Sequence, residues 1–525
     1  MREITTLYQA LLHRATLSPD SEALIEENRR WTYHELLMAS DRAADMFWQL
    51  GLRKGDKAAI VLRNCAEFLI AQFALARIGA ASVPVNFMIT RRGEIEFILK
   101  DSGAKAAVTS SEFAAPYLEL AGAAGEFCHV LAIDSPPRHA LDFWHKVKTA
   151  PHHHDINRLE VLPDDTATLL YTSGTTGHPK GVILTHKNLL SNTRSAAHTF
   201  HVDKTDVFLC LLPLFHTFAF TVTALIPLLT GGKTVITPRI APAKPWLYTM
   251  GREGVSIMVG VPQIFSVIAK EARGLARLYM QHWAFRRVRC CFSGAAPLSA
   301  AVHKHFEDTL GISLFEGYGL TETAPIVSAN HPHGRKRGSV GRPVPGVQVK
   351  IVDEAERTLP HDREGEICVR GPNVTRGYHG NRQATKEMLT ADGWFKTGDI
   401  GLLDGEGFLF IRDRKKDMII VKGLKVYPAQ VEAVAHEHPA VAEAAVIGVP
   451  DEYGEELIKC FVTIKPGAPA DKHDILKFLR SRLDPYKRPR DVEILEAMPK
   501  NTLNKILKRD LRRREAEKLN SFGAA

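Results

Sequence analysis

A glycine-rich stretch in the first half of the chain has the composition of an anion-binding loop. Residues 171–181, YTSGTTGHPKG, contain three glycines, four Ser or Thr hydroxyls and one lysine. The stretch is too rich in glycine to hold a helix, and it offers too little apolar surface to form core. Its backbone N–H groups, hydroxyls and lysine instead suit a dense anion, so the pattern predicts a loop that binds a phosphate chain.

The loop is not the common P-loop, G-x-x-x-x-G-K-[ST]. Counting from Gly174, Pro179 stands where the second glycine is required. Gly181 follows Lys180 where that motif needs Ser or Thr. The sequence therefore indicates phosphate chemistry in a different arrangement.

Four further stretches follow the loop in a recognisable order. They are GYGLTET (317–323), WFKTGDIG (394–401), DRKKDMIIVKGLKVYP (413–428) and PKNTLNKILKRDL (499–511). Together with the loop they resemble the adenylate-forming enzymes, the superfamily of acyl-CoA synthetases, peptide-synthetase adenylation domains and luciferases. The resemblance extends over nearly the whole chain and is strongest to medium- and long-chain fatty acid–CoA ligases.

This resemblance implies a two-step reaction with ATP and coenzyme A. A carboxylate is a poor electrophile, so members of the superfamily first join it to AMP, releasing pyrophosphate, and a thiol then displaces AMP. The first step brings a carboxylate up to a triphosphate, and one pair of like charges at about 4 Å costs roughly 4 kcal/mol at an effective dielectric of about 20. Cations and oriented donors must offset that repulsion.

The resemblance assigns the nucleotide to three groups of residues. The phosphate contacts are Thr172, Ser173, Gly174, Thr175, Thr176, Gly177 and Lys180. The adenine contacts are Gly294, Ala295, Ala296, Glu316, Gly317 and Tyr318. Thr321 is expected at the α-phosphate, while Thr176 and Glu322 are expected to hold Mg²⁺, which prefers oxygen ligands. Taken alone, GYGLTE is also typical of a turn with a helix cap.

The ribose is expected to contact an aspartate late in the chain. Asp399, in KTGD, matches the acid that accepts hydrogen bonds from the ribose hydroxyls, and one carboxylate can bind two neighbouring hydroxyls. Arg414 matches a second contact to the ribose or phosphate. An isolated Gly-Asp pair is also common in ordinary turns.

Further residues implied by the resemblance lie near the carboxyl end. Lys505 matches the lysine that bridges the carboxylate and the α-phosphate, although Asn504 precedes it where most relatives have glycine. Asparagine tolerates a left-handed backbone better than other non-glycine residues. Lys416 matches a hinge about which the small domain turns, and Lys422 with Gly423 matches the path of coenzyme A.

The acyl pocket is the least explicit part of the sequence. PLFHTFAF (213–220) resembles the segment whose histidine, here His216, gates the substrate channel. VGVP (259–262) and residues 319–320 are expected to line adjacent walls. No Lys or Asp is placed to fix the charged groups of an amino acid, so the apolar lining favours a fatty or aromatic acid, which gains about 0.8 kcal/mol per buried CH₂.

Several functions remain open at this point. The leading hypothesis is an ATP-dependent fatty acid–CoA ligase. The alternatives are an aryl acid–CoA ligase, an acyl-AMP ligase that loads a carrier protein, a luciferase-like oxygenase, and a non-catalytic nucleotide-binding protein at a membrane surface. Lys180, Glu322, Asp399 and Lys505 argue against the non-catalytic class.

The elements that must position these residues predict an α/β fold. Apolar helical patterns alternate with short β-rich runs up to about residue 160 and again after residue 164, which is typical of parallel sheets. Short β runs with many turns between residues 338 and 411 suggest a small barrel or antiparallel sheet. We expect an N-terminal AMP-binding domain (1–413) of two parallel α/β sheets plus that small barrel, and a smaller mobile α+β C-terminal domain (414–525).

Composition limits the setting of the protein. Seven scattered cysteines without a CxxC pair favour reduced thiols in the cytoplasm. A net charge of +9 fits an acidic metabolite or a basic surface. The basic tail, KILKRDLRRR, lacks the interleaved aromatics of a nucleic-acid site, so no nucleic-acid partner is expected. A peripheral membrane contact and a homodimer are left open.

One apolar run, residues 207–232, is long enough to cross a bilayer. Pro213, His216 and Pro227 interrupt it. The expected structure is instead a turn followed by a buried helix, with a strand on either side.

Overall fold

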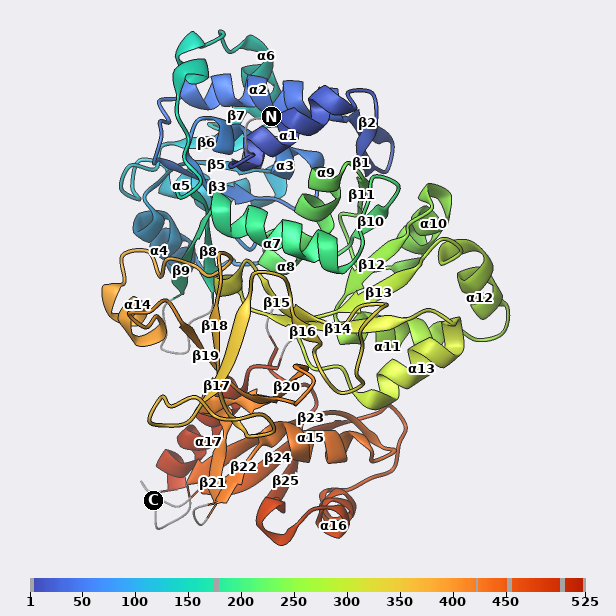
Figure 1. Cartoon of the computed structure of the whole chain (residues 1–525). Helices are drawn as coiled ribbons and strands as arrows, with labels where there is room; N and C mark the ends of the chain where they lie inside the picture. The colour runs from blue at the N-terminus through green and yellow to red at the C-terminus, as the bar shows by residue number, and fades with distance from the viewer. Residues whose placement is uncertain (1–3, 173–178, 422–423, 451–455, 501–505, 523–525) are drawn as a thin grey trace. The chain divides into compact units, whose positions relative to one another are not determined.

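The computed structural model describes residues 4–172, 179–421, 424–450, 456–500 and 506–522. The chain forms two compact units (Figure 1). The larger comprises Met1–Val349 and Val369–Lys396, and the smaller comprises Lys350–Cys368 and Thr397–Ala525. The predicted boundary at residues 413 and 414 concerns mobility and stays a prediction. Compactness alone places Lys350–Cys368 and residues 397–413 with the C-terminal part.

A seven-stranded sheet forms the first layer of the large unit. Its strands are β3 (Lys57–Val61), β4 (Ala81–Pro84), β5 (Ala104–Thr109), β6 (His129–Ala132), β7 (Leu141–Asp142), β8 (Thr166–Thr172) and β9 (Lys180–Thr185). Their order is β7-β6-β5-β3-β4-β8-β9. All neighbours are parallel except β8 and β9, which pair antiparallel, so the predicted parallel sheet is confirmed.

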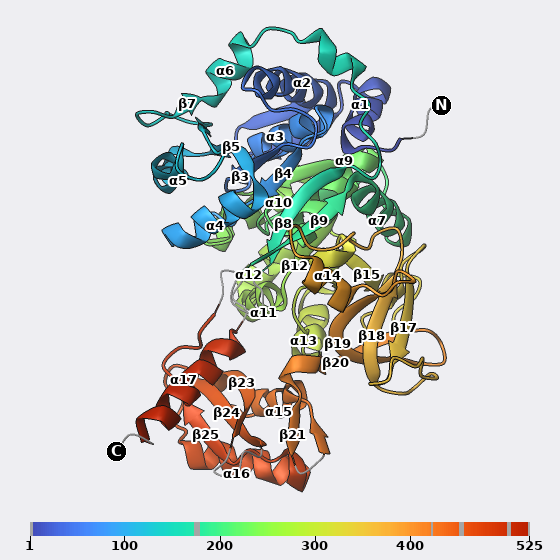
Figure 2. The ribbon, with the colours of Figure 1, turned by 90° about the vertical axis from the view of Figure 1, so that its left-hand side faces the viewer.

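Helices cover this sheet. They are α1 (Leu7–Leu17), α2 (Tyr33–Gln49), α3 (Ala66–Arg77), α4 (Arg92–Ser102), α5 (Ala114–Leu120), α6 (Phe143–Thr149) and α7 (His186–Thr199). The α2 helix begins with a capping box, in which Thr32 and Glu35 each satisfy a backbone N–H of the other. It packs on α3, which is buried along almost its whole length and lies against β3 and β4 (Figures 1 and 2).

A second, nine-stranded sheet carries the predicted adenine residues on its strands or directly after them. Its strands are β1 (Glu22–Glu26), β2 (Arg29–Thr32), β10 (Val207–Cys210), β11 (Lys233–Ile236), β12 (Ile257–Gly260), β13 (Cys290–Ser293), β14 (Leu314–Gly319), β15 (Ile326–Ala329) and β16 (Arg342–Pro343). The order is β16-β15-β14-β13-β12-β10-β11-β1-β2. The central strands are parallel, while β2, β15 and β16 pair antiparallel at the margins.

Six further helices of the large unit accompany this sheet. They are α8 (Thr217–Ala219), α9 (Ile226–Thr230), α10 (Ala243–Glu253), α11 (Pro262–Glu271), α12 (Gly274–Tyr279) and α13 (Ala300–Leu310). The helix α14 (Arg382–Met388) lies beside β9 instead, where Ala384 is buried in the same cluster as Val182 and Leu184 (Figure 1). No described helix is both long and apolar enough to cross a membrane.

The apolar run at residues 207–232 forms a turn and a buried helix between β10 and β11, as predicted. Pro227 does not break the helix, in contrast to the expectation. A π-helical turn, Phe220–Leu225, joins α8 to α9 around the proline. Because Pro227 has no N–H, the Thr223 carbonyl loses its usual partner, and the Thr234 hydroxyl donates to that carbonyl at 2.9 Å instead.

The small unit is built on three sheets. The strands are β17 (Gln348–Val352), β18 (Gly365–Arg370), β19 (Phe395–Leu403), β20 (Leu409–Arg414), β21 (Ile419–Val421), β22 (Leu424–Val426), β23 (Val441–Pro450), β24 (Glu456–Ile464) and β25 (Asp491–Ile494). They form the sheets β17-β18-β19-β20, β21-β22 and β23-β24-β25. Helices α15 (Pro428–His436), α16 (Lys472–Arg482) and α17 (Lys508–Phe522) pack on the last sheet (Figure 2). The unit is therefore α+β, as predicted.

All seven cysteines lie in described residues and carry free thiols, so the expectation of an unbridged chain is confirmed.

Candidate active site

The phosphate loop joins two antiparallel strands. Thr172, the last residue of β8, pairs with Lys180, the first residue of β9, and the Thr172 hydroxyl lies 3.5 Å from the Lys180 carbonyl oxygen. Residues Ser173, Gly174, Thr175, Thr176 and Gly177 lie outside the described residues. The sequence did not predict β9, whose register brings Lys180 level with Thr172.

Lys180 lies against a tyrosine that sequence reasoning did not select. The Lys180 ammonium is 5.2 Å from the centroid of the Tyr378 ring, which is a cation–π distance. The Tyr378 hydroxyl donates a hydrogen bond of 2.9 Å to Glu322 Oε1. Burial, followed by the Glu322 carboxylate, raises the pKa of Tyr378, so the phenol stays protonated and keeps donating. Tyr378 thus connects the predicted phosphate-binding lysine to the predicted magnesium ligand.

Backbone pairing fixes Tyr378 in this position. Val182 of β9 forms an isolated antiparallel bridge with Tyr378, and the His379 N–H donates to the Gly181 carbonyl at 2.7 Å. The Thr375 N–H donates to the Glu322 carbonyl at 2.8 Å. The only signal in the sequence is a Gly-Tyr pair about 200 residues after the loop, which carries no spacing rule that links it to Lys180.

The predicted adenine residues meet at the carboxyl edge of the nine-stranded sheet. In register, Gly260 lies beside Ser293, and Ser293 lies beside Glu316. Gly294, Ala295 and Ala296 follow β13 directly, whereas Glu316, Gly317 and Tyr318 belong to β14. The structure therefore brings the two predicted adenine segments together. Carboxyl edges of parallel strands are where α/β folds bind ligands.

Close packing explains the small residues along this edge. A Cβ at Gly294 would lie 2.8 Å from the Phe218 ring, and a Cβ at Gly319 would lie 1.8 Å from the Pro325 carbonyl oxygen. The next residues form a tight turn in which the Thr323 hydroxyl donates to the Pro325 carbonyl at 2.6 Å. Thr321 begins this turn, so Thr321 and Glu322 directly follow β14.

Glu316, on β14, is the one acid among the predicted adenine residues. Burial raises its pKa to about 7, although the Leu298 backbone N–H donates to the carboxyl group and acts in the opposite direction. The carboxyl group thus titrates near neutral pH and can present either a donor or an acceptor to a base.

His216 lies in a largely buried environment. It precedes α8, its ring packs on Phe215 with centroids 4.4 Å apart, and burial lowers its pKa to about 4. The imidazole is therefore neutral at pH 7. Three buried polar atoms in and near this segment have no hydrogen-bond partner among the residues that the structure describes: His216 Nε2, Thr217 Oγ1 and Ser293 Oγ. Such atoms are expected to meet a ligand or water.

In the small unit, the predicted ribose residues form an ion pair. Asp399 on β19 pairs in register with Arg414 on β20, and Arg414 Nε lies 2.7 Å from Asp399 Oδ1. The Asp399 side chain is 4% exposed and the Arg414 side chain is 41% exposed. The Thr397 hydroxyl accepts from the Asp399 N–H at 3.1 Å and fixes the turn that presents the carboxylate.

The predicted hinge residue follows β20 directly. Lys416 lies in a short 3₁₀ helix, Lys415–Asp417, and burial lowers its pKa despite the nearby Asp417. Asp417 pairs with Arg512 of α17 at 2.7 Å, so the hinge is linked to the last helix of the chain.

Three predicted site residues in the small unit lie outside the described residues: Lys422, Gly423 and Lys505. The ends of the segment that contains Lys505 are described. Lys500 forms a β-bridge with Ile506, and Lys508 pairs with Glu432 at 2.8 Å.

The oxygen donors suit a magnesium ion better than a transition metal. Within the described part of the chain, no group of three or more His, Cys, Asp or Glu side chains is placed to hold a metal ion. Glu322 offers a half-buried carboxylate beside the phosphate loop. One carboxylate is sufficient protein ligation for Mg²⁺ when substrate phosphates and water supply the rest.

Comparison with known proteins gives the family. A family model described as "AMP-binding enzyme" matches residues 11–379, and one described as "AMP-binding enzyme C-terminal domain" matches residues 430–505. The chain belongs to the AMP-binding enzymes. The long-chain-fatty-acid–CoA ligase of Bacillus subtilis (strain 168) is 34% identical to it over 98% of this chain and 95% of that protein.

Two further similar proteins widen the view of this family. The 4-coumarate–CoA ligase 2 of Oryza sativa subsp. japonica is 32% identical over 96% of this chain and 92% of that protein. The crystal structure of ATP-bound MatB from Rhodopseudomonas palustris superposes with a TM-score of 0.87 at 29% identity, covering 98% of this chain and 99% of that one. The resemblance and fold class inferred from sequence are thus confirmed for this AMP-binding enzyme.

Proposed function

We propose that this AMP-binding enzyme is an ATP-dependent fatty acid–CoA ligase. In the first step, a carboxylate oxygen of the acid attacks the α-phosphorus of ATP, and pyrophosphate leaves. In the second step, the coenzyme A thiolate attacks the acyl carbon, the thioester forms, and AMP leaves with the oxygen that came from the acid.

The observation that carries the proposal is the contact chain from Lys180 through Tyr378 to Glu322. The Lys180 ammonium lies 5.2 Å from the centroid of the Tyr378 ring, and the Tyr378 hydroxyl lies 2.9 Å from Glu322 Oε1. A lysine offsets the charge of phosphate oxygens, and a carboxylate suits the metal ion that accompanies them. The hydroxyls and backbone N–H groups of residues 172–177 are proposed to line the same phosphates.

Mg²⁺ is proposed to be held by Glu322 and Thr176. When bound, it would neutralise part of the phosphate charge and favour departure of pyrophosphate. The chain itself positions the ligand, because the Tyr378 hydroxyl bonds one oxygen of Glu322 and leaves the carboxylate a fixed direction.

The base and the ribose are proposed to bind residues on strands β14 and β19 and the segment after β13. Glu316, Gly317 and Tyr318 on β14 and Gly294–Ala296 after β13 offer a narrow slot for adenine. Asp399 is proposed to accept hydrogen bonds from the ribose hydroxyls, with Arg414 paired to its carboxylate.

Lys505 is proposed to bridge the carboxylate and the α-phosphate in the first step. Lys422 and Gly423 are proposed to serve the thiol in the second step, after the small domain (residues 414–525) turns about Lys416. Lys505 cannot stay on the α-phosphate while the thiol approaches the acyl carbon of the acyl-AMP. The small domain must therefore turn between the two steps.

A fatty acid is favoured as substrate by the character of residues 213–220. His216 is neutral, and Phe215, Phe218 and Phe220 are buried or half-buried around it. An apolar channel gains binding free energy with each buried CH₂, about 0.8 kcal/mol. The naming of the Bacillus subtilis relative, a long-chain-fatty-acid–CoA ligase, supports the same class.

A second candidate is an aryl acid–CoA ligase, favoured by the rice relative named 4-coumarate–CoA ligase 2. The same aromatic side chains could stack on a planar acid. Chain-length dependence separates the two, because an aryl pocket gains nothing from additional methylenes.

The test is release of pyrophosphate from ATP with saturated acids of increasing length and with aryl acids, each with and without coenzyme A. We expect release that rises with chain length and acyl-CoA as the product. Release without any coenzyme A dependence or thioester would indicate a ligase that loads a carrier protein. Preference for coumarate over every aliphatic acid would favour the second candidate, and no release with any acid would refute both.

A further inference from the structure

The helix α12 projects from the large unit with an apolar face in solvent. None of its six residues is buried. Leu275 is 84% exposed, Leu278 is 50% exposed and Tyr279 is 40% exposed. A single exposed apolar side chain is ordinary in a soluble protein, but a contiguous set marks a surface that binds something.

These side chains extend to the neighbouring helix. Tyr248 of α10 is 52% exposed, and its hydroxyl lies close enough to that of Tyr279 for the two to interact electrostatically. Its ring stacks on Trp283 with ring centroids 6.0 Å apart. We call Tyr248, Leu275, Leu278 and Tyr279 the α12 surface. It combines aliphatic side chains with tyrosines, an aromatic type that favours the boundary between water and lipid.

Basic residues occupy the other face of the helix. Leu275, Leu278 and Tyr279 share one face because they are three and four residues apart, and Arg273 and Arg277, four apart, share the opposite one. Neither arginine, nor Lys270 just before them, forms an ion pair with any residue the structure describes. An apolar face backed by Arg and Lys is the pattern of a helix that lies in a membrane interface.

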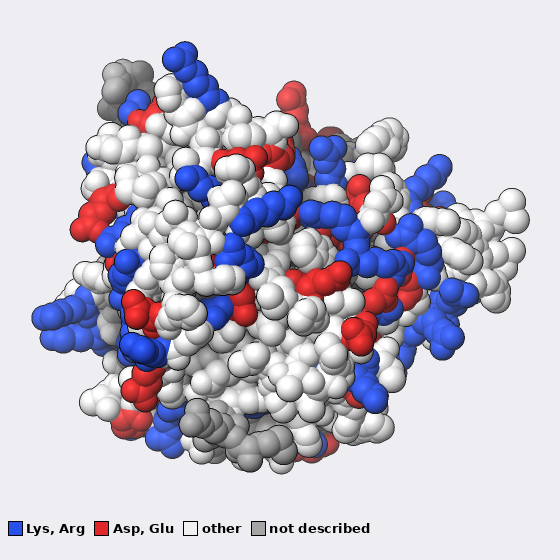
Figure 3. Space-filling model, turned by 90° about the horizontal axis from the view of Figure 1, so that it is seen from above, with Lys and Arg blue, Asp and Glu red and all other residues white. Residues whose placement is uncertain are grey.

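The figures show this arrangement. α12 lies at the right-hand margin of Figure 1, and the same margin seen from above shows a white projection with Lys and Arg side chains gathered beside it (Figure 3).

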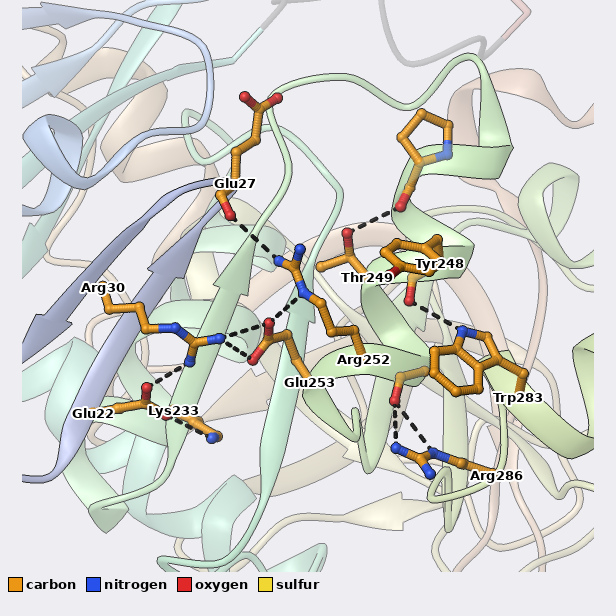
Figure 4. A network of polar contacts seen from close by, with 12 residues as sticks. Glu22, Glu27, Arg30, Lys233, Tyr248, Thr249, Arg252, Glu253, Trp283 and Arg286 are labelled. Atoms are coloured by element: carbon orange, nitrogen blue, oxygen red, sulfur yellow. Dashed lines mark hydrogen bonds and ion pairs between the residues drawn. The ribbon is translucent and has the colours of Figure 1, made fainter.

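Hydrogen bonds to backbone carbonyls hold the residues next to the α12 surface in place. The Trp283 Nε1–H donates to the Tyr248 carbonyl at 3.3 Å, and the Arg286 guanidinium donates to the Gly251 carbonyl at 2.9 Å (Figure 4). Glu253, the last residue of α10, pairs with Arg30 and Arg252. It therefore does not cancel the cations of α12.

We propose that the α12 surface docks the protein on a membrane rich in anionic phospholipid. The apolar side chains would enter the boundary between headgroups and acyl chains, while Lys270, Arg273 and Arg277 remain at the level of the phosphates. Glu271 is the one exposed acid of this stretch, so positive charge prevails there.

A second copy of the chain fits the α12 surface less well. A stable dimer usually buries about 20–30 residues on each partner, and this surface has four. A symmetric contact would also bring the same arginines face to face, in a chain of net charge +9. The lipid surface is complementary in charge and needs no partner of matched shape.

The inference does not depend on the proposed substrate, because binding to vesicles needs neither ATP nor an acid. The experiment uses the full chain and two kinds of vesicle, phosphatidylcholine alone and phosphatidylcholine mixed with phosphatidylglycerol. Partition is measured by co-sedimentation at several salt concentrations. The variants are L275A/L278A, which removes the apolar face, and R273A/R277A, which removes the charges.

We expect binding to the mixed vesicles only. Each arginine near an anionic leaflet contributes about fivefold, so R273A/R277A is expected to lower the partition about 25-fold. L275A/L278A is expected to lower it at least tenfold, since two leucines no longer leave water. The matched controls, Leu162→Ala and Arg138→Ala, remove an exposed leucine and an exposed arginine elsewhere and are expected to change nothing.

Two results would overturn the proposal. Binding that survives L275A/L278A would mean a general attraction of a basic protein to anionic lipid. A dimer in sedimentation velocity that L275A/L278A abolishes, with no vesicle binding, would assign the surface to a second copy. Pyrophosphate release in solution with a short acid verifies that each variant is folded, and its absence in the wild type would count against the proposed function alone.

Discussion

The hydroxyl of Tyr378 offers a sharp test of the phosphate site. Its removal in Tyr378→Phe deletes one hydrogen bond to the Glu322 carboxylate and keeps the ring beside Lys180. A hydrogen bond to a charged group contributes about 1.5–3 kcal/mol, which corresponds to about a 10- to 150-fold change in rate or binding. The residue is 8% exposed, so water does not easily replace the lost donor.

In the pyrophosphate-release assay, kcat/KM for ATP is expected to fall at least about tenfold. The Mg²⁺ concentration needed for half-maximal activity is expected to rise. The assay follows pyrophosphate release at saturating acid over a range of Mg²⁺. Tyr117→Phe is the matched control, because the buried Tyr117 hydroxyl has no hydrogen-bond partner in the described part of the chain, and its loss is expected to change neither quantity. A Tyr378→Phe enzyme with wild-type rate and wild-type Mg²⁺ dependence would refute the role of this contact.

Four further substitutions are expected to have distinct effects. Asp399→Asn should raise the KM for ATP about tenfold or more by weakening the charged hydrogen bonds to ribose, and an unchanged ATP KM in steady-state assays would contradict that role. Lys505→Ala should cripple acyl-AMP formation yet spare thioester formation from supplied acyl-AMP, whereas Gly423→Leu should do the reverse. Rapid-quench measurement follows each half-reaction separately. Equal loss of both half-reactions in either variant would count against a domain that turns between the two steps. Glu316 has a folded-state pKa of about 7, raised by burial above its ordinary value, so its contribution to stability is full below that ordinary value and declines as pH rises toward 7. Glu316→Gln should therefore melt at a higher temperature relative to wild type at pH 8 than at pH 4, and scanning calorimetry showing the opposite trend would exclude that burial effect.

Local patterns in the sequence were sufficient for the regular elements. The start of α2 is such a local feature, because the capping box of Thr32 and Glu35 acts within one turn. The strand–helix alternation predicts parallel sheets because a parallel pair needs a crossover. The order of five motifs predicts the family.

The departures from prediction arise from contacts that are distant along the chain. Pro227 was expected to interrupt its helix, and it does not because Thr234, on the next strand, satisfies the carbonyl that the proline leaves free. Tyr378 was missed because its two partners lie about 200 and 56 residues before it and meet it only through the pairing of β9 with the 375–379 segment. The raised pKa of Glu316 follows from burial, which no local pattern encodes.

The claim that a carboxylate is activated through acyl-AMP can be tested by following one oxygen atom. The enzyme is incubated with ATP, coenzyme A and a saturated fatty acid labelled with ¹⁸O in both carboxylate oxygens, and the products are weighed by mass spectrometry. Attack of the acid on the α-phosphorus, followed by attack of the thiolate on the acyl carbon, predicts one ¹⁸O atom in AMP and one in the acyl-CoA carbonyl. Unlabelled AMP, or ADP and phosphate in place of AMP and pyrophosphate, would contradict it.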